Sequence, residues 1–203
     1  MAYSDFTSLQ KLTAELGVTH KRYSLFNAVI AINPSQKLID DINEAQNYYS
    51  LTTEKAKSEF LIAPLLKEVK RTHLEKVSIF SGVNLETHRA GLNGFCDFIL
   101  TNTADSVELI APICCLVEAK NRSIEEGFAQ CAAEMIAAIL FNEENNIKSE
   151  IMFGCVTNGY EWCFLKLENN QVLIDTERFF LNELARILGV FQCIITQANC
   201  LVR

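Results

Sequence analysis

The sequence is poor in the residues that interrupt regular structure. It has 8 glycines and 3 prolines among 203 residues, and it shows no internal repeat or low-complexity segment. No flexible linker is therefore evident. The length suits one domain with a core of its own, and we divide it into an N-terminal helical extension, residues 1–52, and a core domain, residues 53–203.

Long apolar runs and targeting signals are also lacking. No stretch is long enough to span a bilayer, and the first residues, MAYSDFTSLQKL, mix polar and apolar side chains from the second position. We therefore expect no signal peptide and no membrane partner. A soluble, cytoplasmic protein is the expectation.

Patterns typical of zinc sites and disulfide frameworks are absent although the chain has 8 cysteines. There is no Cys-x-x-Cys pair, and the 3 histidines have no ligand-like spacing. A cysteine nucleophile would need a nearby base that the sequence does not offer, so a cysteine-dependent hydrolase is a weak third hypothesis. Buried, reduced thiols are expected at the seven cysteines that lie in apolar stretches: Cys96, Cys114, Cys115, Cys131, Cys155, Cys163 and Cys193.

An excess of positive charge is missing too, since the formal net charge is −7. This argues against a general binder of polyanions. It does not exclude a nucleic-acid partner, because the local field over one face decides binding and acids in a metal site would themselves make the total negative.

What the sequence does contain is a clear succession of periodic segments. Apolar residues at helical spacing predict helices over 4–16, 35–49, from Thr53 with a kink or break at Pro64, over 123–141, and from about Phe180. The apolar segment 23–32 is predicted to be a buried strand or helix. Strands are predicted within 76–88, 94–102, 107–120, 151–168 and 171–176, with a hairpin at Asn158-Gly159.

The order of these segments predicts the fold class. Helices come first, then three meandering strands, a helix, two or three strands and a last helix. This order is typical of a mixed α/β sheet with helices on both faces. The helix after the third strand must cross over, so part of the sheet should be parallel.

Charged residues end the most apolar of these strands. In ICCLVEAKN, residues 113–121, the run leads directly into Glu118-Ala119-Lys120. Residues two apart in a strand share a face, so the carboxylate and the ammonium should project together. The same spacing in Glu68-Val69-Lys70 lies on a predicted helix, where it separates the two side chains.

Two further acids are candidates for the same place. Asp97 lies inside the apolar strand GFCDFIL, where an aspartate is disfavoured, with Phe95 and Ile99 expected on its own face. If the two strands are antiparallel, Asp97 lies beside Glu118, and a divalent cation would relieve the repulsion between the two carboxylates. Glu59 lies at the edge of the apolar stripe of a preceding helix and could face the sheet.

This constellation resembles the PD-(D/E)XK nuclease superfamily, whose fold is the restriction-endonuclease-like mixed β-sheet flanked by helices. The resemblance implies that Glu59 matches the helical acid, Asp97 the acid of the PD element, Glu118 the second metal ligand and Lys120 the catalytic lysine. Cys96 stands where the pattern has proline.

The resemblance covers roughly residues 53–168. SEFLIAPLLKEV is similar to the first helix of nuclease domains in type I restriction subunits and their stand-alone relatives. Gln130 lies where several branches carry a Gln-x-x-x-Tyr element, and is a possible accessory residue, although Glu134 replaces the tyrosine.

What the resemblance implies is Mg²⁺-dependent hydrolysis of phosphodiester bonds in DNA, with Mn²⁺ as a substitute. Asp97, Glu118 and the carbonyl of Ala119 would hold the ion, Lys120 would position or deprotonate water, and Glu59 would bind a second ion or an outer water.

Alternatives remain open at this point. The same fold can serve as a non-catalytic interaction module in which the acids are structural. Glu118 and Lys120 would then form a solvated ion pair, and Asp97 would accept backbone hydrogen bonds. The N-terminal helices would be an accessory or dimerisation element, which leaves a homodimer as an option.

Overall fold

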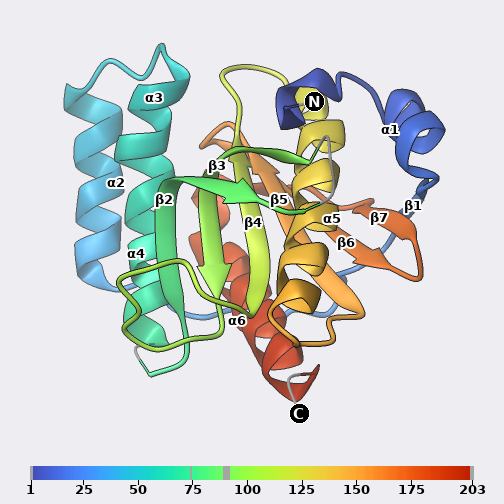
Figure 1. The fold of residues 1–203 in the computed structure, drawn as a ribbon. Coiled ribbons are helices and arrows are strands. Elements are labelled where there is room, and N and C mark those ends of the chain that lie inside the picture. Colours follow the sequence, from blue (N-terminus) through green and yellow to red (C-terminus); the bar gives the residue numbers. More distant parts are fainter. Residues whose placement is uncertain (1, 74, 89–91, 202–203) are drawn as a thin grey trace.

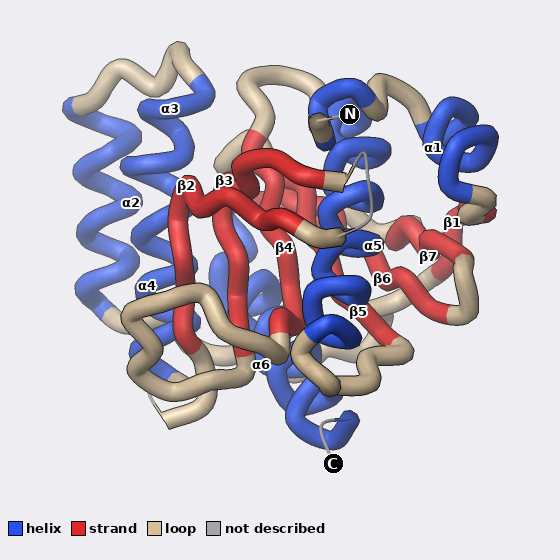
Figure 2. The backbone as a smooth tube through the Cα atoms, viewed as in Figure 1, coloured by secondary structure: helices blue, strands red, loops and turns tan. Residues whose placement is uncertain are grey.

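An eight-stranded mixed β-sheet with helices on both faces organises the chain (Figure 1). The computed structural model describes residues 2–73, 75–88 and 92–201. The strand order is β1-β7-β6-β5-β4-β3-β2, and β8 pairs with β6 (Figure 2). The strands are β1 Thr19–Tyr23, β2 Ser78–Glu86, β3 Asn93–Thr101, β4 Ile113–Ala119, β5 Ile151–Thr157, β6 Glu161–Glu168, β7 Gln171–Asp175 and β8 Phe179–Phe180.

The strand directions confirm the predicted fold class. Strands β2, β3 and β4 form an antiparallel meander, and helix α5 then crosses over to β5, which is parallel to β4. The predicted hairpin joins β5 to β6 through residues 158–160. Strand β1 lies at one edge of the sheet, where it is parallel to β7, and β2 lies at the opposite edge.

Six α-helices lie on the two faces of this sheet among the described residues: α1 Leu9–Leu16, α2 Gln36–Tyr48, α3 Glu54–Lys57, α4 Ala63–Thr72, α5 Phe128–Glu144 and α6 Leu184–Leu201. The interruption predicted at Pro64 is a π-helical turn, Ser58–Ile62, between α3 and α4. Pro64 itself lies in the first turn of α4, where the missing N–H is tolerated. None of these helices combines the length and apolarity needed to cross a membrane.

Two apolar clusters form the core, one on each face of the sheet. Residues of α2, α4 and α6 pack on one face, and residues of α1 and α5 pack on the other. Residues 1–52, expected to be a helical extension, supply α1 to one face, α2 to the other, and the edge strand β1.

The prediction for residues 23–32 is wrong. Beyond Tyr23 the chain has no regular structure until α2 begins, although Phe26 is buried against Phe164 with ring centroids 5.6 Å apart. The apolar side chains therefore pack on the sheet from an irregular segment, whose backbone is fixed in part by the hydrogen bond from Leu25 N to Asp175 Oδ1. Strand β1 was missed because all five of its residues are exposed and lack an apolar pattern.

Candidate active site

Asp97, in the middle of β3, lies beside Glu118, which is near the end of the adjacent strand β4. The antiparallel register of β3 and β4 pairs Phe98 with Val117, so continuing it by one residue sets Asp97 opposite Glu118. Asp97 Oδ2 accepts a hydrogen bond of 2.8 Å from the backbone N–H of Ala119. The predicted juxtaposition of the two strands is thus present, and one oxygen of Asp97 holds the end of β4.

The backbone rotates where Asp97 lies, and this corrects the predicted alternation of faces. Cys96 and Phe98 should share a face, but Cys96 packs with the α5 cluster and Phe98 with the α4 and α6 cluster. Opposite Asp97 on β2 lies Gly82, whose φ of +63° is a conformation that side chains disfavour. Phe95, expected beside Asp97 on a buried face, is 72% exposed.

Glu118 and Lys120 project together, as the two-residue period predicts. Their side chains form an ion pair in which the Lys120 ammonium donates a hydrogen bond to Glu118 Oε1. The side chain of Glu118 is 2% exposed and that of Lys120 is 17% exposed. This is not the solvated pair that the alternative interpretation expected. Glu68 and Lys70, at the same spacing on α4, make no such pair: Glu68 binds Ser35 and Arg71 instead.

Helix α5 extends this pair into a buried polar network. Lys120 Nζ donates to Gln130 Oε1 at 3.1 Å, and Gln130 Nε2 donates to Glu134 Oε1 at 3.2 Å. Residues four apart on a helix face the same way, so Gln130 and Glu134 both reach the strand end. Glu134 is completely buried. The network places a second carboxyl beside Glu118.

Burial and mutual repulsion raise the pKa values of the acids in this network. Burial, followed by the negative charge of Asp97, raises the pKa of Glu118 to about 7. Burial, followed by the neighbouring Glu118, raises the pKa of Glu134 well above its ordinary value. Burial alone would lower the pKa of Lys120, but the Glu118 carboxylate outweighs it and the pKa is raised. Lys120 is therefore a protonated donor, and the raised pKa of Glu134 favours its protonated form.

A cleft of about 350 Å³ lies beside Asp97, between β3 and the α3–α4 helix. Glu59, the candidate helical acid, lines this cleft together with Asp97 and Ala119. Glu59 is half exposed and pairs with Lys55 at 2.8 Å. Glu118 and Lys120 are not part of the cleft wall and instead extend toward α5. The candidate residues thus form two groups that meet at Ala119.

Two contacts with α5 fix the position of β4. The buried side-chain amide of Asn142 bonds both backbone groups of Ile113 at the start of the strand, at 2.7 and 2.9 Å. At the other end, a Cβ on Gly127 would lie 2.6 Å from Val156 Cγ1 and 3.2 Å from Lys120 Cε. Glycine at 127 therefore lets the start of α5 approach Lys120.

Carboxylate oxygens are the ligands that a hard cation such as Mg²⁺ prefers. Glu118 Oε2 is buried and has no hydrogen-bond donor among the described residues, and Asp97 retains a second carboxylate oxygen. Within the described part of the chain, no group of three or more His, Cys, Asp or Glu side chains is arranged to hold a metal. Two carboxylates are the usual protein share of a Mg²⁺ site, but Asp97 lines the cleft while Glu118 lies outside its wall and extends toward α5.

Three residues of this region were not predicted from sequence. Glu134 was noted only as a replacement for tyrosine, yet the single acid within the apolar run FAQCAAEMIAAILF, residues 128–141, was a usable signal. Gly127 carried no signal. Lys57 of α3 also carried none: its ammonium donates to Asn121 O and lies 3.3 Å from Asn121 Oδ1, which ties the α3 helix to the loop after Lys120.

The thiols do not favour the cysteine-hydrolase hypothesis. Burial raises the pKa of Cys114 and of Cys163 to about 12, and raises that of Cys115, Cys131 and Cys155 as well. Thiolates are the reactive form, so these side chains behave as small apolar groups near neutral pH. All seven cysteines with described side chains are free thiols, and only Cys193 among them is partly exposed.

No protein-family model matches the chain, and a search of curated proteins finds no match either.

Proposed function

We propose that the protein is a divalent-metal-dependent nuclease with a restriction-endonuclease-like fold that hydrolyses DNA in the cytoplasm. The observation that carries the proposal is the arrangement of Asp97 and Glu118-Ala119-Lys120. Asp97 lies in the middle of β3 and the other three residues at the end of the antiparallel strand β4, and the hydrogen bond from Ala119 N to Asp97 joins them.

The order of the elements supports the same proposal. A helix with an acid, Glu59, precedes the β2–β3–β4 meander, and Asp97 and Glu118 lie on its second and third strands. The crossover helix α5 then contributes Gln130 beside the lysine. This is the order on which the resemblance to the nuclease superfamily was based.

The chemistry divides among these residues. Asp97, Glu118 and the carbonyl of Ala119 would hold Mg²⁺ or Mn²⁺, which supplies positive charge for the phosphate and lowers the pKa of bound water. Lys120, kept protonated by Glu118, donates hydrogen bonds to a phosphate oxygen and stabilises the charge that develops in the transition state. Gln130, on α5, accepts a hydrogen bond from the Lys120 ammonium. Glu59, which lines the same cleft as Asp97, would bind a second ion or an outer water molecule.

Cleavage of plasmid and single-stranded DNA tests the proposal. The purified protein with Mg²⁺ or Mn²⁺ should nick supercoiled plasmid or degrade single strands, and EDTA should stop it. Replacing Asp97 by Asn should abolish the reaction. Absence of cleavage with either metal, together with no metal-induced rise in melting temperature, would refute the proposal.

One observation favours the non-catalytic alternative. Asp97 already accepts a backbone hydrogen bond, and Glu118, Lys120, Gln130 and Glu134 already bond one another. A strand end satisfied in this way can be purely structural in an interaction module. The two functions are separated by the metal-dependent thermal shift, which only a cation site produces.

A further inference from the structure

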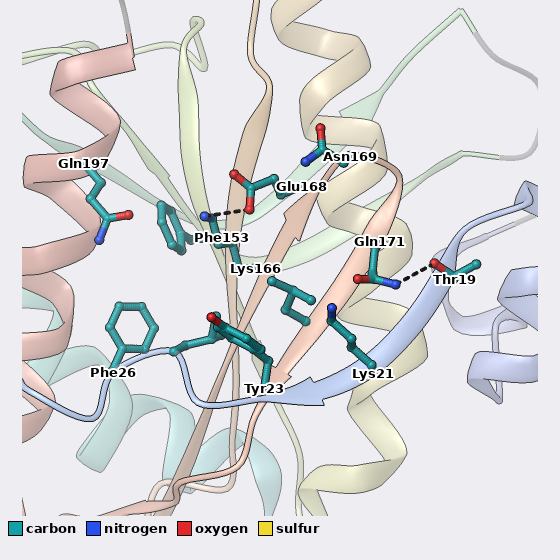
Figure 3. A pocket seen from close by; sticks show the side chains of 12 residues that line it. Thr19, Lys21, Tyr23, Phe26, Phe153, Lys166, Glu168, Asn169, Gln171 and Gln197 are labelled. Carbon is teal, nitrogen blue, oxygen red and sulfur yellow. Dashed lines mark hydrogen bonds and ion pairs between the residues drawn. The ribbon is translucent and has the colours of Figure 1, made fainter.

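A second cavity, of about 500 Å³, lies at the opposite edge of the sheet from the candidate active site (Figure 3). Its floor is formed by β1, β7, β6 and β5, and Gln197 of α6 stands at one side. The volume is in the range typical of small-molecule sites. None of the candidate catalytic residues lines it.

Strand pairing brings the polar residues of the floor together. Lys21 pairs with Leu173, which pairs with Lys166, which pairs with Phe153, so these four side chains form one row on the same face. In the neighbouring row, Gln171 lies between Thr19 and Glu168.

The cavity has an unbalanced positive charge. Lys166 is paired with Glu168 at 2.9 Å and is mostly buried. Lys21 has no carboxylate within ion-pair distance in the described parts of the chain, and its ammonium lies 5.6 Å from the centre of the Tyr23 ring. An anionic group placed at Lys21 would therefore be attracted without first displacing an acid.

Aromatic side chains lie next to this charge. Tyr23 is 53% exposed and shares its face with Lys21, while Phe26 and Phe153 are almost completely buried at the floor. An exposed tyrosine above an apolar floor offers a stacking surface to a planar ring.

Side-chain amides complete the lining. Gln171 donates its Nε2 hydrogen to Thr19 Oγ1 at 3.1 Å, which leaves its carbonyl oxygen available (Figure 3). Gln197 approaches from the opposite side of the cavity, and Asn169 lies at the β6–β7 turn. An amide donates and accepts at once, which matches the edge of a nucleobase.

We propose that this cavity binds a nucleoside monophosphate, with the phosphate at Lys21, the base against Tyr23, and its polar edge toward the side-chain amides that line the cavity. The site is independent of the proposed nuclease activity. Lysines on an edge strand also discourage strand pairing between chains, but that role does not require an aromatic ring or side-chain amides beside them.

Calorimetric titration of the full-length protein with AMP, in EDTA, tests the proposal. Inorganic phosphate and adenosine are titrated separately, and each should bind at least about tenfold more weakly than AMP, because each lacks one half of the recognition. Lys21→Gln should weaken AMP binding by about tenfold or more. Tyr23→Ser should weaken both AMP and adenosine.

Arg22→Gln is the matched control, because it removes the same charge from the same strand. Arg22 pairs with Ile174, which belongs to the α5-side cluster, so its side chain lies on the other face. This variant should bind AMP as the wild type does, and Asp97→Ala should too. Equal losses in Lys21→Gln and Arg22→Gln, loss of binding in Asp97→Ala, or no binding of millimolar AMP would each overturn the proposal. Tighter binding of a trinucleotide than of AMP would also overturn the assignment to a free nucleotide.

Discussion

The Lys120 ammonium and the Glu118 carboxylate form an ion pair from which solvent is almost excluded. Such a pair differs from a surface salt bridge because neither charge can return to water when its partner is removed. It links the stability of the strand end to the residues proposed to perform chemistry there.

Lys120→Met should therefore destabilise the protein as well as abolish cleavage, by about 3 kcal/mol in the free energy of unfolding near pH 8. Without the ammonium, the pKa of Glu118 should rise beyond its value of about 7. A carboxyl whose pKa is raised in the folded state loses stability as pH increases through that range, so the defect should shrink at pH 5.5. Urea unfolding at both pH values measures this.

Lys55→Met is the control for that variant, because Lys55 pairs with Glu59 on the exposed surface of the α3–α4 helix. It should leave the urea midpoint unchanged at both pH values. A defect in Lys120→Met that is equally small at both pH values would mean that Glu118 does not depend on the lysine.

Asp97 can be tested with two variants that separate charge from hydrogen bonding. Asp97→Asn retains an acceptor for the Ala119 N–H, so its free energy of unfolding should stay close to that of the wild type. In Asp97→Ala the free energy of unfolding should fall by about 1 kcal/mol. Both should abolish the Mg²⁺-induced rise in melting temperature and DNA cleavage. Retention of cleavage in Asp97→Asn would assign Asp97 a structural role only.

Glu134→Gln should make the protein more stable at alkaline pH. The pKa of Glu134 is raised by burial and by Glu118, so the folded wild type must keep a proton that the unfolded chain releases above about pH 4.5. That requirement lowers wild-type stability progressively as pH rises, and glutamine removes it. Thermal unfolding from pH 5 to pH 8.5 should show the melting temperature of the variant rising relative to that of the wild type.

Glu143→Gln, an exposed change on the same helix, is the control. The difference between its melting temperature and that of the wild type should stay constant across that pH range. If the stability difference between Glu134→Gln and the wild type is also independent of pH, Glu134 is ionised in the folded protein and its pKa is not raised.

The sequence predicted the parts of this site that depend on local periodicity. The two-residue period of β4 correctly placed Glu118 and Lys120 on one face, and the crossover helix correctly predicted that β5 is parallel to β4. The prediction for Cys96 was wrong because regular alternation fails where β3 rotates opposite Gly82. Such a rotation depends on the pairing of two strands, which a single strand's pattern does not contain.

Tertiary contacts explain the other residues that sequence reasoning did not find. Glu134 joins the site only because α5 lies directly over the end of β4, and Lys57 reaches Asn121 across 64 positions of the chain. Strand β1 illustrates the converse case: backbone pairing with β7 makes five exposed residues into a strand that has no apolar pattern.

Gly127→Ala should lower both stability and cleavage, because the added methyl group would lie 2.6 Å from Val156 Cγ1 and would press on Lys120. Overpacking of this kind costs about 1–3 kcal/mol, and a shift of the lysine by about 1 Å can lower the rate roughly a hundredfold. Gly154→Ala is the matched control: its methyl group would meet Met135 Sδ at 2.5 Å and Cys131 Sγ at 2.8 Å, in the same core but away from Lys120. Chemical unfolding should give similar free energies of unfolding for the two variants. Cleavage measured well below both melting temperatures should fall sharply only in Gly127→Ala. Equal activities in the two variants would show that Gly127 serves packing alone and that the position of Lys120 does not limit the reaction.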